Sequence, residues 1–154
     1  SPKGVIFSSH CGSGQIEKQY CIEKNRLTVH YRSTQIEKSC IEIQLNLAMP
    51  SCDGFSGRYR LDDGSIPCGF GEKLLLDHLD EITLEDAELG GSVALHFNPP
   101  LQLLAEPYYT ASQSEAGFEK IMQGVCLNLD FDNLANETLT ITLTVVPSSE
   151  EKSS

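Results

Sequence analysis

The chain has 154 residues, of which 40% are hydrophobic, and a net charge of −11. A chain of this length usually forms one domain that can bury an ordinary hydrophobic core. Its acidic charge repels phosphate groups and argues against nucleic acid as a partner. No run of about eighteen apolar residues is present, so we expect no membrane insertion.

Alternating apolar residues predict strands along most of the chain. The pattern recurs in five segments: 27–32, 39–47, 92–98, 125–132 and 138–145. In the last segment, Leu139, Ile141 and Leu143 alternate with threonines, which suit the solvent-facing side of a strand. Strands that are apolar on one face belong to antiparallel sheets. We therefore expect a mostly β protein, either an antiparallel β-sandwich or a β-barrel.

Two short helices are expected to interrupt these strands. Residues 72–80 place three leucines at helical spacing, Leu75, Leu76 and Leu79. Residues 112–124 open with the sequence SQSE, which is typical of a helix N-terminus, and end at a glycine. Both helices would cover an end or an edge of the sandwich.

The predicted domain spans residues 1–147. The segment 148–154 contains no core-forming residue and is expected to be a disordered tail or the stub of a linker. No signal peptide opens the sequence, which therefore reads as a mature or trimmed chain. Within the domain, the last two strands are expected to form a hairpin with 132–136 as its loop.

Six cysteines suggest a framework of disulfides. They are Cys11, Cys21, Cys40, Cys52, Cys68 and Cys126. Cysteine metal sites use pairs about two to four residues apart, whereas the closest cysteines here are ten apart. The alternatives to disulfides are free or mixed thiols.

The strand pattern suggests where the disulfides lie. Cys52 and Cys68 flank a Gly- and Asp-rich excursion that a disulfide would close into a stapled loop. Cys21, Cys40 and Cys126 lie on the non-apolar side of their strands, so we expect two of these three to be joined. Disulfides persist only outside the reach of cellular reductants. The expected location is therefore extracytoplasmic: secreted, periplasmic or at the cell surface.

The stapled loop carries the predicted ligand-binding residues, which are Phe55, Arg58, Tyr59 and Arg60. Aromatic residues and arginine are enriched at binding hot spots because they offer large contact areas and planar hydrogen-bonding forks. The expected partner is a cell-surface glycan or protein. In the alternative interpretation, the two aromatic residues pack the loop onto the sheet and the two arginines neutralise Asp62 and Asp63.

We expect no cofactor, with calcium as the alternative. Asp130, Asp132, Asn133 and Asn136 gather oxygen ligands of the kind that calcium prefers. The same residues are equally typical of a solvated acidic loop. The sequence contains neither a nucleophilic serine elbow nor a paired-histidine zinc motif. We therefore predict no catalytic residues.

These features favour a non-catalytic, secreted or surface-displayed binding or adhesion module. Two alternatives are an assembly subunit of a surface fibre or appendage, and a small secreted hydrolase or hydrolase inhibitor. The charge is +2 over residues 1–50 and −13 over residues 51–154. This asymmetry could support self-association, or it could be solvated surface alone.

Overall fold

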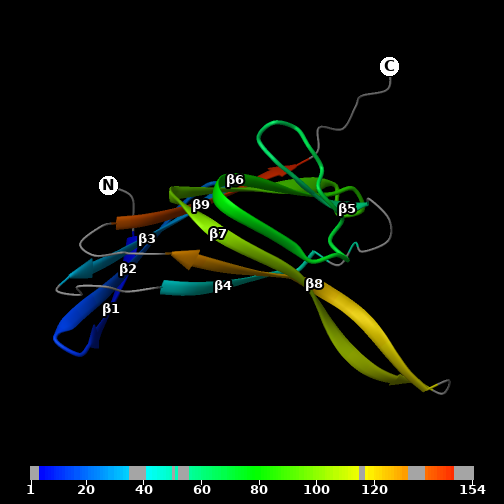
Figure 1. Ribbon diagram of the computed structural model, residues 1–154, viewed down its shortest axis with the longest axis horizontal. Coiled ribbons are helices and arrows are strands. Elements are labelled where there is room, and N and C mark those ends of the chain that lie inside the picture. The colour runs from blue at the N-terminus through cyan, green and yellow to red at the C-terminus, as the bar shows by residue number, and fades with distance from the viewer. Residues whose placement is uncertain are drawn as a thin grey trace.

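The computed structural model describes residues 4–34, 41–49, 51, 56–114, 117–131 and 138–147 (Figure 1). These residues form nine strands and, within the described ranges, no helix. The strands are β1 (Gly4–Cys11), β2 (Gly14–Glu23), β3 (Arg26–Thr34), β4 (Ile41–Leu47), β5 (Gly57–Arg60), β6 (Leu74–Asp86), β7 (Gly91–Ser114), β8 (Gly117–Phe131) and β9 (Thr138–Pro147). Accordingly, this part of the chain has no helix long and apolar enough to cross a membrane.

The long hairpin of β6 and β7 bends halfway along its length and so belongs to two layers. The first half of β7, Gly91–Asn98, pairs with β9, whereas the second half, Gln102–Ser114, pairs with β8. Pro99 and Pro100 separate the halves, and proline interrupts a ladder because it has no backbone N–H to donate. The register of β6 shifts opposite this point, where His78 adopts a positive φ of 56°.

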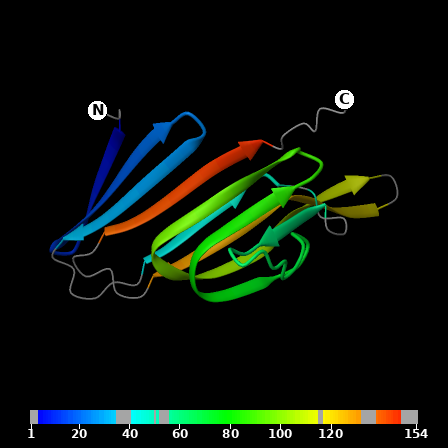
Figure 2. The same cartoon turned by 90° about the horizontal axis from the view of Figure 1, so that it is seen from above.

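The two layers pack face to face in a sandwich-like arrangement. One has the strand order β1-β2-β3-β9-β7-β6-β5, and the other adds β4 and β8 to the second half of β7. Figure 1 shows β9 above β8 and β4, and Figure 2 shows β1 to β3 at one end of the molecule. The core between the layers is built from fully buried side chains: Ile82, Leu84, Leu95, Phe97, Leu139 and Ile141 from one layer, and Leu103, Leu127 and Leu129 from the other.

The mostly β, antiparallel prediction is confirmed, and the alternating segments coincide with strands. In β8, Val125, Leu127 and Leu129 are all buried, as the alternation predicts. The predicted hairpin of the last two strands is wrong, because β8 lies between β4 and β7 whereas β9 lies between β3 and β7. β8 pairs instead with the preceding strand β7 and with the distant β4, and β9 pairs with the distant β3 and with β7, which local alternation does not reveal.

The predicted helix at 72–80 is wrong, because most of this segment belongs to β6. Leu74 is buried, Leu75 is exposed and Leu76 is half-buried, which is the alternation of a strand. The register shifts between Leu76 and Leu79 place the next inward leucine three residues on instead of two. A spacing of three residues is also typical of one helical turn, which explains the wrong prediction.

The predicted helix at 112–124 is also wrong, because this segment forms the far end of the β7–β8 hairpin. Ser112 pairs with Glu119, and Ser114 with Gly117. Of the apolar residues in β8, Met122 is buried while Phe118 and Ile121 are exposed, so they do not form one helical face. Serine and glycine serve tight turns as well as helix ends, which explains the error.

The disulfide framework is not supported, because Cys21, Cys68 and Cys126 are free thiols. The predicted closure of Cys52 by Cys68 is wrong, and so is the predicted joining of two among Cys21, Cys40 and Cys126, because every such pair includes a cysteine that is free. Cys40 and Cys52 lie outside the described residues, as does the side chain of Cys11. Cys68 sits in the core, where burial and the nearby charge of Glu72 raise the pKa of its thiol.

Leucine substitutions at the start of β6 distinguish a strand from a helix. Leu74→Ala should lower the free energy of unfolding by about 2–5 kcal/mol because it opens a cavity in the core. Leu75→Ala is the matched control and should change it by less than about 1 kcal/mol. The relevant exposed fractions are 8% for Leu74 and 59% for Leu75. Chemical denaturation measures both variants, and a larger loss for Leu75 would favour the helix.

The reactivity of the thiols tests the disulfide correction. With iodoacetamide at pH 8, Cys21 and Cys126 should react in the folded protein. Cys68 should react at least about tenfold more slowly, because it is buried and less of its thiol is ionised. Unfolding in guanidinium should remove the difference. Peptide mass mapping identifies the labelled sites, and a peptide in which Cys68 is linked to another cysteine would contradict the free thiol.

Candidate functional site

The predicted ligand-binding residues Arg58, Tyr59 and Arg60 lie in β5, at one edge of the first layer. Along this short strand, Tyr59 points inward and is fully buried, whereas both arginines are half-buried on the outer face. The rings of Tyr59 and Phe70 pack edge to face, with their centroids 5.1 Å apart. Tyr59 therefore anchors β5 to the core and does not lie on the surface. Phe55 lies outside the described residues.

Close packing at the start of β5 explains the residue type at Gly57. A Cβ atom there would lie 2.0 Å from the carbonyl oxygen of Ser51 and 2.3 Å from the ring of Phe70. The N–H of Phe70 donates to the carbonyl of Gly57, and the N–H of Tyr59 donates to the carbonyl of Cys68. These contacts hold the segment after β5 against the strand and fix the direction of its arginines.

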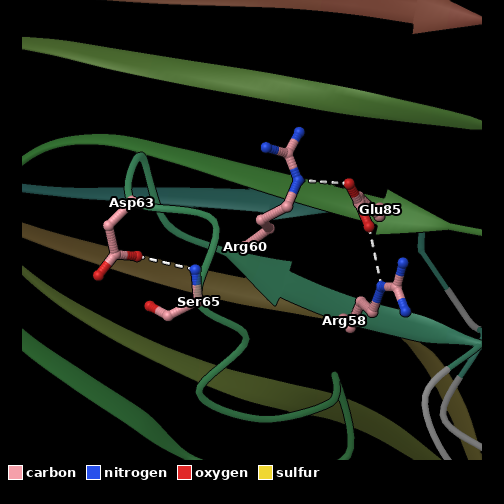
Figure 3. Close-up of polar contacts among 5 residues, drawn as sticks. All are labelled: Arg58, Arg60, Asp63, Ser65 and Glu85. Atoms are coloured by element: carbon pink, nitrogen blue, oxygen red, sulfur yellow. Dashed lines mark hydrogen bonds and ion pairs between the residues drawn. The ribbon is translucent and has the colours of Figure 1, made fainter.

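Glu85 of β6 joins the two arginines on the outer face (Figure 3). Nε of Arg58 donates to Oε2 of Glu85 at 2.8 Å, and Nε of Arg60 donates to Oε1 at 2.5 Å. Arg58 lies directly opposite Glu85 in the ladder, and Arg60 lies diagonally from it. Such cross-strand neighbours share a face of the sheet. We call Arg58, Arg60 and Glu85 the arginine site.

The charge of Glu85 is stabilised by its two partners. Burial raises the pKa of its carboxyl group, but the hydrogen bonds and positive charges of Arg60 and Arg58 outweigh burial and lower it below the ordinary value. The carboxylate is consequently ionised at neutral pH and holds both guanidinium groups in place.

The terminal nitrogens of both guanidinium groups point away from Glu85 in Figure 3. Only Nε of each arginine is engaged with a described residue. Arg58 and Glu85 line an open hollow of about 560 Å³, together with the Gly90–Gly91 turn and the end of β9. The site therefore offers N–H donors to an oxygen-rich group such as a hydroxyl pair or a carboxylate.

A buried carboxylate, Asp86, lies behind the arginine site and is 1% exposed. Its Oδ1 accepts hydrogen bonds from Oγ of Ser51 at 2.6 Å and from the backbone N–H groups of Glu88 and Leu89. Its Oδ2 has no hydrogen-bond partner among the described residues. Asp86 orders the turn between β6 and β7 that forms one wall of the hollow.

The arginines do not form the ion pairs with Asp62 and Asp63 that the alternative interpretation of the sequence predicted. The arginines pair with Glu85, whereas Asp63 accepts a hydrogen bond from the backbone N–H of Ser65 within the turn after β5 (Figure 3). The hydrogen bonds from Ser65 lower the pKa of the Asp63 carboxyl group. Sequence reasoning missed Glu85 because its partners are adjacent only through the β5–β6 pairing.

The calcium prediction falls mostly outside the described residues. Asp130 lies near the end of β8, opposite Glu42 and Gln102. Asp132, Asn133 and Asn136 are not described. Within the described ranges, no three acidic, histidine or cysteine side chains are grouped as metal ligands. Calcium therefore stays a prediction.

Comparison with known proteins gives a family match over nearly the whole chain. A family model described as "Alpha-amylase/4-alpha-glucanotransferase, C-terminal" matches residues 2–145. The chain belongs to this family. No curated protein matches it in sequence.

A solved structure contains a region with a fold similar to that of this chain. The crystal structure of 4-alpha-glucanotransferase from Thermococcus litoralis aligns with a TM-score of 0.59 at 18% sequence identity. The alignment covers 94% of this chain but 21% of that chain, so this chain spans about a fifth of the length of the enzyme it resembles.

The family corrects the function predicted from the sequence. A secreted or surface-displayed adhesion module is contradicted, because the match identifies a C-terminal domain of the amylase and glucanotransferase family. Alternating strands are compatible with many functions, so the sequence pattern did not separate an adhesion module from a domain of this family.

The acid sensitivity of the arginine site is testable. A carboxylate whose pKa is lowered by folding stabilises the protein above its unfolded pKa, and this contribution disappears as the pH falls through the folded pKa. Glu85→Gln should lower the free energy of unfolding at pH 7 by up to about 1 kcal/mol, since the pair is partly exposed. Well below pH 4.5, the ordinary value for this carboxyl group, the loss should shrink.

Denaturation with urea at pH 7 and pH 3 measures the difference. Glu81→Gln is the matched control, because Glu81 is exposed in the same strand and makes no ion pair with a described residue. Equal losses for Glu85→Gln at both pH values would show that the side chain acts through packing and not through charge.

Proposed function

We propose that this chain is a non-catalytic accessory domain of a larger enzyme that acts on α-glucan. The observation that carries the proposal is the coverage of the two matches. The family model, whose description is that of a C-terminal region, spans residues 2–145, whereas the chain covers 21% of the glucanotransferase chain it resembles in fold. A region that corresponds to about a fifth of the glucanotransferase chain has the size expected of an accessory domain.

The chemistry of the arginine site supports a non-catalytic role. Cleavage or transfer of a glycosidic bond uses two carboxyl groups, one of which must keep its proton at the working pH. The pKa of Glu85, the carboxyl group of this site, is shifted downward. Glu85 is also held by two arginines, so it is suited to positioning donors and unsuited to proton transfer.

The experiment is to incubate the purified 154-residue chain with maltoheptaose and to separate the products by chromatography. We expect neither shorter oligosaccharides from hydrolysis nor longer ones from transfer, while an α-amylase run in parallel gives shorter ones. Product formation that co-purifies with the chain and disappears when one of its own carboxyl groups is replaced by an amide would refute the non-catalytic role.

A further inference from the structure

Figure 1 shows that the far ends of β7 and β8 leave the body of the protein as a two-stranded arm. A second hollow is lined in part by residues of these two strands. It has a volume of about 560 Å³ and is lined by Lys73, Glu106, Tyr108, Tyr109 and Lys120, among others. Both tyrosines come from β7, and Lys120 comes from β8. We call this set the tyrosine hollow. It does not share a residue with the arginine site.

An irregularity in the ladder brings two consecutive tyrosines to this hollow. Adjacent residues of a regular strand point to opposite faces, yet Tyr108 and Tyr109 line the same hollow. The register shifts between them, because Tyr108 pairs with Gly124 and Tyr109 pairs with Met122. Such shifts bend a strand and redirect its side chains.

Gly124 lies directly opposite Tyr108 in the ladder and has no side chain to pack against its ring. The space that a Cβ atom of Gly124 would take is filled by β4, since this atom would lie 2.1 Å from the carbonyl oxygen of Leu47. The side chain of Tyr108 is 53% exposed.

Polar groups surround the exposed ring. Nζ of Lys120 lies 3.8 Å from the centroid of the Tyr109 ring, which occupies one face of that ring. Nζ of Lys73 contacts Oε1 of Glu106 at 2.8 Å, and the side chains are 63% and 41% exposed, respectively. The hollow thus combines one open aromatic face with two ammonium donors and one carboxylate acceptor.

This combination matches the chemistry of a glucose unit. A pyranose ring has apolar C–H faces that stack on an aromatic ring, and an edge of hydroxyl groups that both donate and accept hydrogen bonds. The net charge of −11 disfavours anionic ligands of the nucleic-acid type, which could also use a tyrosine and lysines. The arginine site lacks an exposed aromatic side chain among its described residues, because Tyr59 is buried.

We infer that the tyrosine hollow is an α-glucan-binding subsite, in which Tyr108 stacks on a sugar ring while Lys73, Glu106 and Lys120 contact its hydroxyl groups. The choice of α-glucan rests on the proposed function. Because the hollow is open, we expect it to bind α-glucan weakly. The hollow binds the glucan and does not catalyse a reaction on it.

The test is isothermal titration of the 154-residue chain with maltoheptaose, with cellohexaose as the β-linked comparison. We expect saturable binding of maltoheptaose that is weakened about tenfold or more by Tyr108→Ala, since the stacked ring carries much of the contact. Tyr108→Phe keeps the ring and should retain binding. Circular dichroism establishes that each variant is folded.

Two control variants locate the binding surface. Phe118→Ala removes an aromatic ring that is 82% exposed on the same arm but outside the hollow, and it should leave binding unchanged. Arg60→Gln alters the arginine site and tests the competing location for glucan. Loss of binding in Arg60→Gln with normal binding in Tyr108→Ala would overturn the inference and place glucan at the arginine site.

The remaining outcomes also separate this inference from the proposed function. No binding of maltoheptaose by the unaltered chain, or equal binding of cellohexaose, would overturn the α-glucan subsite. Either result leaves the accessory role intact as long as the chain forms no products from maltoheptaose. Product formation, by contrast, refutes the accessory role whatever the titrations show.

Discussion

The architecture depends on the bend in the long β6–β7 hairpin. At Pro99 and Pro100 the β7 ladder changes partner, and opposite them the register of β6 shifts. Both strands cross the bend, so each strand contributes one of its halves to the first layer and its other half to the second layer. The two layers therefore remain parts of one continuous hydrogen-bonded sheet. The buried side chains on the two halves, such as Phe97 and Leu103, then enclose a single core.

Both candidate sites follow from this geometry. The tip of the hairpin carries Asp86 and stands beside β5, where Tyr59 fills the core and leaves two arginines on the outer face with Glu85. The other half of β7 runs beyond the body into the arm, where a second register shift lies next to the exposed Tyr108. Rigid strands position each group, and local irregularities decide which side chains reach solvent.

The two sites suit different tasks. The arginine site holds an ionised carboxylate and directs guanidinium donors outward, which favours recognition of oxygen-rich groups over proton transfer. The tyrosine hollow adds an aromatic face that the arginine site lacks among its described residues. Together with the family match, these features favour a domain that assists an α-glucan-acting enzyme. The extracytoplasmic location stays a prediction, and the predicted disulfides that involve Cys21, Cys68 or Cys126 no longer support it, because these three thiols are free.

The sequence by itself determined the mostly β class and which face of most strands is buried, because period-two alternation in segments such as Val125 to Phe131 reflects local backbone geometry. It also singled out Arg58 and Arg60, but as part of a stapled loop and not of the strand β5. Only the tertiary structure decided which strands pair, since β8 and β9 take partners from distant segments. The same holds for Glu85 as the partner of both arginines and for the register shifts that imitated a helix. These features arise from the pairing of one strand with another, which the alternation within a single segment does not encode.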